Sequence, residues 1–286
     1  MPSLNLYSDL AAIANNIQED AYFAVREGGT MQRLIKVFQD SSGGNPRVGY
    51  YYSSNTAVAI DEDTDLNSTT FKPTADQTLT PGEIGLQYFV SDLRAESELP
   101  ENIIADAKTD LALAALAKVE SDLCGDLSSL SGGSIGASGS AITWGYVSAA
   151  IAQARNANKN PNVPLSCVIH GYQWAVLAKA ASVAGSSLAQ APGVTEEITR
   201  TGWVATFMGV PIYQVFASPD TNSDFIGGVF PATALAIDWR RGIKVEAERN
   251  ASRRGTEFNM SAVYAHGVWR PALGVKMTFA ATAPTS

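Results

Sequence analysis

The spacing of apolar residues predicts two helices that each bury one face. The first lies at the start of the chain, where Ser8 or Asp9 caps it and the glycine pair at 28–29 ends it. The second is a long helix over 101–130, about 45 Å at 1.5 Å per residue. Their apolar stripes are Leu6, Leu10, Ile13, Ile17, Ala21 and Ala24, and Ile103, Ala107, Leu111, Ala114, Ala115, Val119 and Leu123. A terminal helix cannot bury such a stripe alone, so the first helix must lie on the body or on a neighbour.

Between these helices, β-branched and aromatic residues predict a long hairpin. Residues 48–60 form the outgoing strand, which contains three consecutive tyrosines at 50–52, and residues 84–90 form the returning strand. An acidic turn at 61–65 lies near a tip that carries few large apolar residues. Because a two-stranded hairpin is marginal in water, we expect this one to contact something outside its own domain.

The second half of the chain predicts short helices and strands. Residues 131–140 read as a Gly/Ser linker and hinge, and Thr143 caps a helix. A loop is expected over 182–201. The buried face of the Thr143 helix is Val147, Ala150, Ile151 and Ala154. Further elements are a strand at 166–170, a helix at 174–181, and strands at 210–216, 225–230 and 235–237.

The most regular pattern is a two-stranded ribbon near the C-terminus. It consists of strands 243–249 and 257–269 with a turn at 253–255, and a last strand follows at 274–279. Strict alternation places one set of side chains on one face: Phe258, Met260, Ala262, Tyr264, His266 and Val268. The element order contains no βαβ run and no internal repeat, and it predicts an α+β fold.

Composition narrows the class of protein. The chain has 286 residues, 45% of them hydrophobic, with a mean hydropathy of −0.01, so it can bury a substantial core. Only 17% are charged, and the net charge of −8 argues against a free-standing nucleic-acid binder. Residues 1–238 hold 12 basic and 25 acidic side chains (net −13), whereas residues 239–286 hold 8 and 3 (net +5). This asymmetry either favours self-association or is chance.

Targeting signals and disulfides are not expected. No apolar run approaches the roughly 18 residues of a membrane span. The start of the chain lacks the basic and apolar regions of a signal peptide. Cys124 and Cys167 read as free buried thiols of a protein made in a reducing cytoplasm.

Catalytic and metal motifs are weak. His170 and His266 are the two histidines, and structural roles suit both better than general-base catalysis. Neither a Gly-x-Ser-x-Gly elbow, a phosphate-binding loop nor zinc spacing is present. The 61–65 turn begins like a calcium loop, but Leu66 replaces the required glycine and Lys72 the required glutamate. It is either a solvated acidic turn or a cation site shared between subunits. We predict no catalytic residue, cofactor or metal.

Basic residues cluster along the ribbon: Arg240, Arg241, Lys244, Arg249, Arg253 and Arg254. One interpretation is contact with phosphate or with an acidic partner. The other is cross-strand pairing with Glu246, Glu248 and Glu257 on the same ribbon. Because the whole chain is acidic, we favour contacts with protein over contacts with DNA.

Four segments together resemble the major capsid proteins of tailed phages. Segments 208–213 (MGVPIY) and 230–236 (FPATALA) look like the Gly-Val-Pro strand of that family and its successor. Segments 245–257 (VEAERNASRRGTE) and 270–275 (RPALGV) are similar to its long ribbon and exit. The family often has Asp where this chain has Asn250. The order of elements agrees with the family over nearly the whole chain.

The resemblance implies the Hong Kong 97-type capsid fold and a division of the chain. Residues 1–45 are expected to form an N-terminal arm and residues 46–98 an extended-loop hairpin. Residues 99–159 are expected in a peripheral domain with a long spine helix, 160–237 in an axial domain, and 238–286 in the peripheral ribbon and return strand. We expect no scaffolding extension before the arm, so any scaffolding is expected to be a separate protein or a segment removed earlier.

The resemblance also implies a function. The chain is expected to assemble with itself into hexamers and pentamers of an icosahedral shell around double-stranded DNA, held without sequence specificity. Portal, scaffolding and decoration proteins are further expected partners, and the virion, assembled in host cytoplasm, is the expected location. Candidate inter-subunit contacts are Tyr50, Tyr51, Tyr52, Asp61, Asp63, Asp65, Lys72, Arg240, Arg241, Arg249, Arg253 and Arg254.

Some relatives crosslink a loop lysine to a neighbouring subunit, but Lys72 alone does not predict it. The alternatives to a virion shell are an encapsulin-like shell around a cargo enzyme and a hydrolase with an unfamiliar site.

Overall fold

The computed structural model describes residues 29–40, 44–52, 57, 59–60, 62, 71–97, 103–182, 206–220 and 222–284. Three predictions fall outside these residues. They are the N-terminal helix, nearly all of the loop expected over 182–201, and the acidic positions Asp61, Asp63 and Asp65 of the turn.

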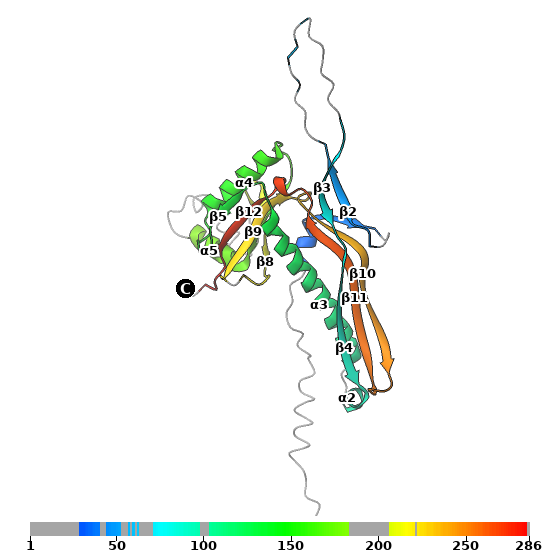
Figure 1. Ribbon diagram of the computed structural model, residues 1–286. Helices are drawn as coiled ribbons and strands as arrows, with labels where there is room; N and C mark the ends of the chain where they lie inside the picture. Colours follow the sequence, from blue (N-terminus) through cyan, green and yellow to red (C-terminus); the bar gives the residue numbers. More distant parts are fainter. Residues whose placement is uncertain are drawn as a thin grey trace, which may run out of the picture.

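A four-stranded sheet forms the elongated half of the molecule, in the order β1-β10-β11-β4 (Figure 1). Its centre is the antiparallel pair of β10 (Leu235–Asn250) and β11 (Gly255–Val268). Strand β4 (Gly82–Ser91) lies antiparallel on the other edge of β11, and β1 (Lys36–Gln39) runs parallel to the start of β10. The short helix α2 (Asp92–Ser97) lies at the far tip of this sheet.

The predicted ribbon is confirmed, with one correction. The alternation on β11 holds, because Phe258, Met260 and Tyr264 are buried, as is Ala262. The strands expected at 235–237 and 243–249 are instead one continuous strand, β10, with register shifts between Trp239 and Lys244. A β-bulge lets the strand continue through polar sequence that breaks the alternation. The predicted boundary between 237 and 238 therefore falls inside β10, three residues from its start.

The long helix α3 (Ile103–Asp126) lies along this sheet (Figure 1). Its 24 residues span about 36 Å, and the 3-10 turn η2 (Leu127–Ser129) continues it. Four stripe residues are at most 2% exposed: Leu111, Ala115, Val119 and Leu123. The first half of the helix packs on Phe258 and Met260, whereas the second half belongs to a core that residues of both sheets share. The helix therefore joins the two halves of the molecule.

The second half is a six-stranded sheet, ordered β5-β12-β9-β6-β8-β7, with two helices against it. The helices are α4 (Trp144–Asn158) and α5 (Gly171–Ser182). The strands are β5 (Ser134–Gly136), β6 (Leu165–His170), β7 (Thr206–Phe207), β8 (Val210–Val215), β9 (Asp224–Pro231) and β12 (Val275–Ala280). The return strand β12 thus lies in this sheet and not beside the ribbon.

Helix α4 follows its predicted pattern closely. The Thr143 Oγ1 accepts the backbone N–H of Tyr146 at 3.4 Å, which caps the helix. The four residues of the predicted stripe are all fully buried: Val147, Ala150, Ile151 and Ala154. They face the six-stranded sheet.

Three of the four glycines expected to form a linker and hinge are packed instead: Gly132, Gly133 and Gly136. Residues 134–136 form β5, which pairs with β12. A Cβ on Gly132 would lie 2.3 Å from the Ala272 carbonyl oxygen, and one on Gly136, whose φ is +86°, would lie 2.5 Å from the Phe279 ring. Glycine is required here because the backbone approaches its neighbours too closely for a side chain. The segment is therefore an ordered connection held against β12 and not a flexible hinge.

The hairpin has the start of its predicted outgoing strand but a different returning strand. Strand β2 (Arg47–Tyr51) pairs antiparallel with β3 (Thr74–Leu79), and this pair extends away from both sheets (Figure 1). The predicted returning strand, residues 84–90, is indeed extended, but as β4 it pairs with β11. The predicted pairing was wrong because β4 continues from β3 after a break at residues 80–81. Both strands are extended, so the pattern alone does not separate them.

Candidate assembly surfaces

An exposed aromatic surface covers the loop hairpin. Tyr50, Tyr51 and Tyr52 are 61%, 43% and 55% exposed, and Phe71 is 72% exposed. The Tyr52 and Phe71 rings stack with centroids 4.5 Å apart and planes 9° from parallel. Lys72, next to Phe71, is also exposed. We call Tyr50, Tyr51, Tyr52 and Phe71 the loop aromatic surface. Phe71 was missed from the sequence because it stood alone in a polar stretch.

The root of this loop is fixed by a charged cluster, which we call the loop-root network. Arg47 on β2 donates its Nε–H to Asp238 Oδ2 at 2.8 Å, and its Nη2 lies 3.2 Å from Asp40 Oδ2. Arg240 reaches the same two carboxylates, at 2.9 Å for Asp238 and 3.2 Å for Asp40. The hydrogen bond to Asp238 is the main cause that raises the pKa of Arg47. Two guanidinium groups and two carboxylates thus lock the loop onto β10.

Arg240 was predicted as an inter-subunit contact, but its side chain is buried within its own chain. Its side chain is only 5% exposed, and it also donates to the Asn45 carbonyl at 2.9 Å. A side chain buried within its own chain offers little surface to another subunit. We assign it to the loop-root network.

The remaining basic residues of the ribbon are exposed, and most have acidic partners. Arg249 donates two hydrogen bonds to Asp92 on α2, at 2.6 and 2.7 Å, and this pairing lowers the pKa of Asp92. Arg241 contacts Glu83 on β4. Within the ribbon, Lys244 pairs with Glu246 at 2.5 Å and Arg253 with Glu257 at 3.0 Å.

The acidic partners expected within the ribbon were thus right for Lys244 and Arg253, but the pairs are not cross-strand. Lys244 and Glu246 lie on the same strand, and Arg253 lies in the turn before Glu257. Arg241 and Arg249 reach acids elsewhere in the chain. Exposed ion pairs of this kind contribute little stability. Arg254 is exposed at the turn, with a φ of +51°.

His170 and Cys167 are both buried, and burial shifts the pKa of each side chain toward its neutral form. His170 is 4% exposed, its Nδ1 accepts the N–H of Tyr172 at 3.1 Å, and burial lowers its pKa. Burial raises the pKa of the Cys167 thiol to about 12, so the thiolate is not available at neutral pH. Among the described residues, no group of three or more His, Cys, Asp and Glu side chains is placed to hold a metal ion.

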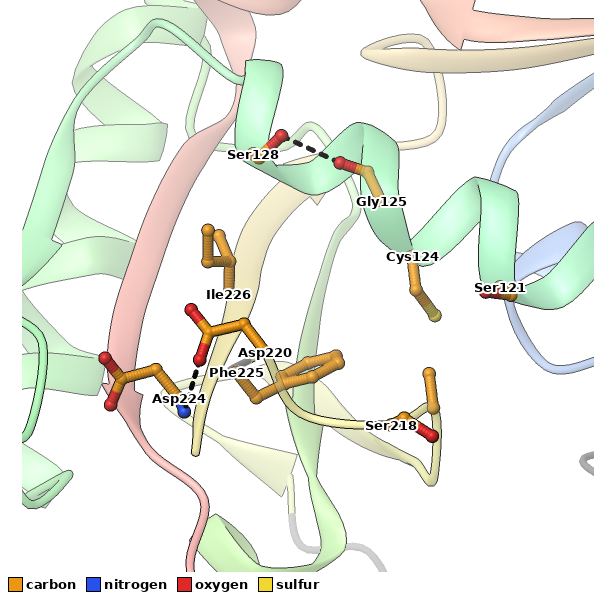
Figure 2. A pocket seen from close by; sticks show the side chains of 10 residues that line it. Ser121, Cys124, Gly125, Ser128, Ser218, Asp220, Asp224, Phe225 and Ile226 are labelled. Atoms are coloured by element: carbon orange, nitrogen blue, oxygen red, sulfur yellow. Dashed lines mark hydrogen bonds between the residues drawn. The ribbon is translucent and has the colours of Figure 1, made fainter. Parts of the chain in front are cut away.

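One cavity of about 340 Å³ lies between α3 and the start of β9 (Figure 2). The Cys124 side chain points from α3 toward Phe225, and Ser121, Gly125 and Ser128 line the same helix face. On the opposite side, Asp220 accepts the backbone N–H of Asp224 at 2.8 Å. The lining residues include neither a histidine nor a lysine, and their carboxylates are Asp220 and Asp224. Asp220 Oδ1 also accepts the backbone N–H of Asn222 at 2.8 Å, so it serves to fix the turn before β9. In the part of the chain that the structure describes, no helix has the length and apolar character to cross a membrane.

Comparison with known proteins identifies the fold. No protein-family model and no curated protein matches the sequence. Solved structures do match. The capsid of cyanophage Pam1 has a TM-score of 0.72 at 11% identity, over 93% of this chain and 96% of that one. The capsid of cyanophage P-SCSP1u has a TM-score of 0.71 at 14% identity, over 93% of this chain and 92% of that one. The mature capsid of bacteriophage PhiM1 has a TM-score of 0.69 at 9% identity, over 92% of this chain and 91% of that one.

Agreement over more than nine-tenths of both chains defines a virus-shell fold. Specifically, the chain has the Hong Kong 97-type fold of tailed-phage major capsid proteins, and its α+β class is as expected.

Proposed function

We propose that this protein is the major structural subunit of a phage capsid and that it assembles with itself into hexamers and pentamers of a closed shell. The observation that carries the proposal is the extent of the match. Phage capsid structures match 92–93% of this chain with TM-scores of 0.69–0.72. The same neighbours favour a phage shell over an encapsulin-like compartment.

In this proposal the four-stranded sheet with α3 is the peripheral part and the six-stranded sheet with α4 and α5 is the axial part. The β2–β3 hairpin is the extended loop. The protein is structural and not an enzyme, its location is the virion, and it encloses double-stranded DNA without sequence specificity. The acidic body, net −13 over residues 1–238, supports this because it repels packed DNA. Portal, scaffolding and decoration proteins are further proposed partners.

The loop aromatic surface supports self-assembly. It lies on a pair of strands that extends away from both sheets, yet its root is held by the loop-root network. A two-stranded hairpin gains little from its own burial. Complete burial of one large apolar side chain contributes about 1.5–3 kcal/mol, and this surface has four aromatic rings to bury. We propose that a neighbouring copy of the chain covers them.

Negative-stain electron microscopy of the purified full chain tests the proposal. Isometric particles tens of nanometres across, on the order expected for a shell, support it. Discrete monomers or dimers under all assembly conditions would overturn it. The double variant Tyr52→Ser, Phe71→Ser should reduce particle yield while leaving the subunit folded. Tyr146→Ser, which removes a 42% exposed aromatic side chain from α4, is the matched control and should still assemble.

A further inference from the structure

A polar seam joins the second half of α3 to β11. Lys118, Asp122 and Asp126 are spaced four residues apart, so they lie on one face of the helix. Tyr264 and His266 are two residues apart and share one face of the strand. Tyr264 donates its hydroxyl to Asp122 Oδ2 at 2.6 Å, and His266 Nδ1 lies 2.9 Å from Asp126 Oδ2.

The charges around His266 are mainly negative. Asp126 contacts Nδ1, and Asp122 Oδ2 lies 3.8 Å from Nε2 on the other side of the ring. Lys118 is the cation on the same helix face, and its Nζ binds the other oxygen of Asp122 at 2.5 Å. On the neighbouring strand β10, the register partner of His266 is the buried, apolar Ile237. On its own strand, the Tyr264 ring lies 5.8 Å away.

The residues directly after His266 pack against the root of the loop. A Cβ on Gly267 would lie 3.2 Å from the Leu79 side chain at the end of β3. A Cβ on Gly49, in β2, would lie 3.2 Å from the ring of Trp269. The Trp269 ring also packs edge-on against Phe38, with centroids 5.1 Å apart. The end of β11 is therefore the point where α3, the ribbon and both loop strands meet.

We propose that His266 is a pH-sensitive latch: its charged ring holds the end of β11, and with it the loop root, against α3, and its neutral ring holds them less firmly. The imidazolium carries two N–H groups, one directed to Asp126 and one facing Asp122. Loss of one proton to solvent leaves a single N–H, so the ring can donate to only one of the two carboxylates. The latch is a property of the subunit and does not depend on the proposed shell.

The direction of the pH effect follows from the site. The hydrogen bond to Asp126 is the main cause that raises the pKa of His266 above its usual 6.5. A group with a raised folded pKa adds stability that is fully present below its unfolded pKa and is lost as the pH rises through the folded pKa. The latch is thus closed at pH values below about 6.5, and it weakens as the pH rises above that through the raised pKa of His266.

Histidine hydrogen–deuterium exchange at ring C2, read by mass spectrometry of the full chain, measures the pKa of each histidine in any assembly state. We expect His266 to titrate above 6.5, and His170 below it, because burial lowers the pKa of His170. Asp126→Asn should lower the pKa of His266. Asp110 is on the same helix, and its carboxylate accepts the hydroxyl of Tyr88. Asp110→Asn is therefore the control and should leave the pKa of His266 unchanged. A pKa for His266 at or below 6.5, or one that Asp126→Asn does not lower, would overturn the proposal.

Backbone amide exchange then tests the mechanical role. His266→Gln should exchange faster than the wild type in peptides covering 74–79 and 264–270, by about threefold or more near pH 6 and by less than about twofold near pH 8.5. Comparing the two proteins at each pH cancels the intrinsic effect of pH on exchange. If His266 has a purely structural role, the ratio of the exchange rates of the variant and the wild type should be the same at both pH values. That result would refute the latch. If no shell forms but the ratio changes, the latch stands and the proposed function fails.

Discussion

Asp238 is predicted to be the critical member of the loop-root network. Its side chain is 0% exposed, and both guanidinium groups of the network converge on it. Asp238→Ala removes the buried carboxylate shared by the nearly buried Arg240 and the partly buried Arg47. Their other carboxylate in the network, Asp40, is 36% exposed, and Arg240 keeps its hydrogen bond to the Asn45 carbonyl. Removing one partner of a buried ion pair costs about 3–5 kcal/mol, so we expect a loss of that order in the free energy of unfolding.

Milder substitutions grade the effect. Asp238→Asn keeps an oxygen that accepts the Arg47 Nε–H but removes the charge, and should cost about 1–3 kcal/mol. Arg47→Met leaves Asp238 paired with Arg240 and should cost about 1–2 kcal/mol, because the Arg47 side chain is 26% exposed and solvent screens part of the interaction.

Urea unfolding of the unassembled subunit, followed by circular dichroism, measures these differences. The double variant Arg47→Met, Asp238→Asn should cost about 1 kcal/mol less than the sum of the single variants, because the two residues interact directly. Proteolysis at sites between residues 53 and 70 should accelerate in parallel if the network holds the loop root. A cost below about 1 kcal/mol for Asp238→Ala would show that the carboxylate is not what fixes the loop.

Three further changes have defined outcomes. Replacing residues 53–70 with a short Gly-Ser linker should leave a folded subunit by circular dichroism that forms no particles by electron microscopy; intact particles would contradict the role of the loop. Gly136→Ala should lose about 2–3 kcal/mol in urea unfolding because of its positive φ and the nearby Phe279 ring, whereas Gly44→Ala, with no atom within 4 Å, should change stability little. His170 has a lowered pKa, so its contribution is present above about pH 6.5 and is lost on acidification. His170→Gln should therefore lose less thermal stability than the wild type between about pH 7 and pH 5, and equal slopes would contradict this.

Local periodicity predicted the elements that bury one face within their own length. The spine helix, the Thr143 helix and the alternation on β11 all appear where they were expected, because each pattern repeats within a few residues. The resemblance to phage capsid proteins added the fold. The inter-subunit roles of the exposed tyrosines and of Lys72 stay predictions.

Pairings between distant residues could not be predicted in the same way. Strand β4 has the pattern of a hairpin strand, and only the tertiary structure places it beside β11. Arg240 looks like its exposed neighbour Arg241 in sequence, yet it is buried against Asp238, whose other partner Arg47 is 191 positions away. An ion pair depends on which surfaces meet, and no local pattern encodes that.

The sequence by itself determined the α+β class, the long helix, the ribbon and an unequal distribution of charge, because propensity and periodicity act over short distances. The tertiary structure decided which carboxylate each basic residue contacts. It also decided that glycines near β5 pack too closely for side chains and that His266 lies beside Asp126, 140 positions away. The His266 contact lies where α3 brings the two sheets together, whereas the other contacts lie at the loop root, at the tip of the ribbon and beside β12. All of them depend on the packing of the whole chain.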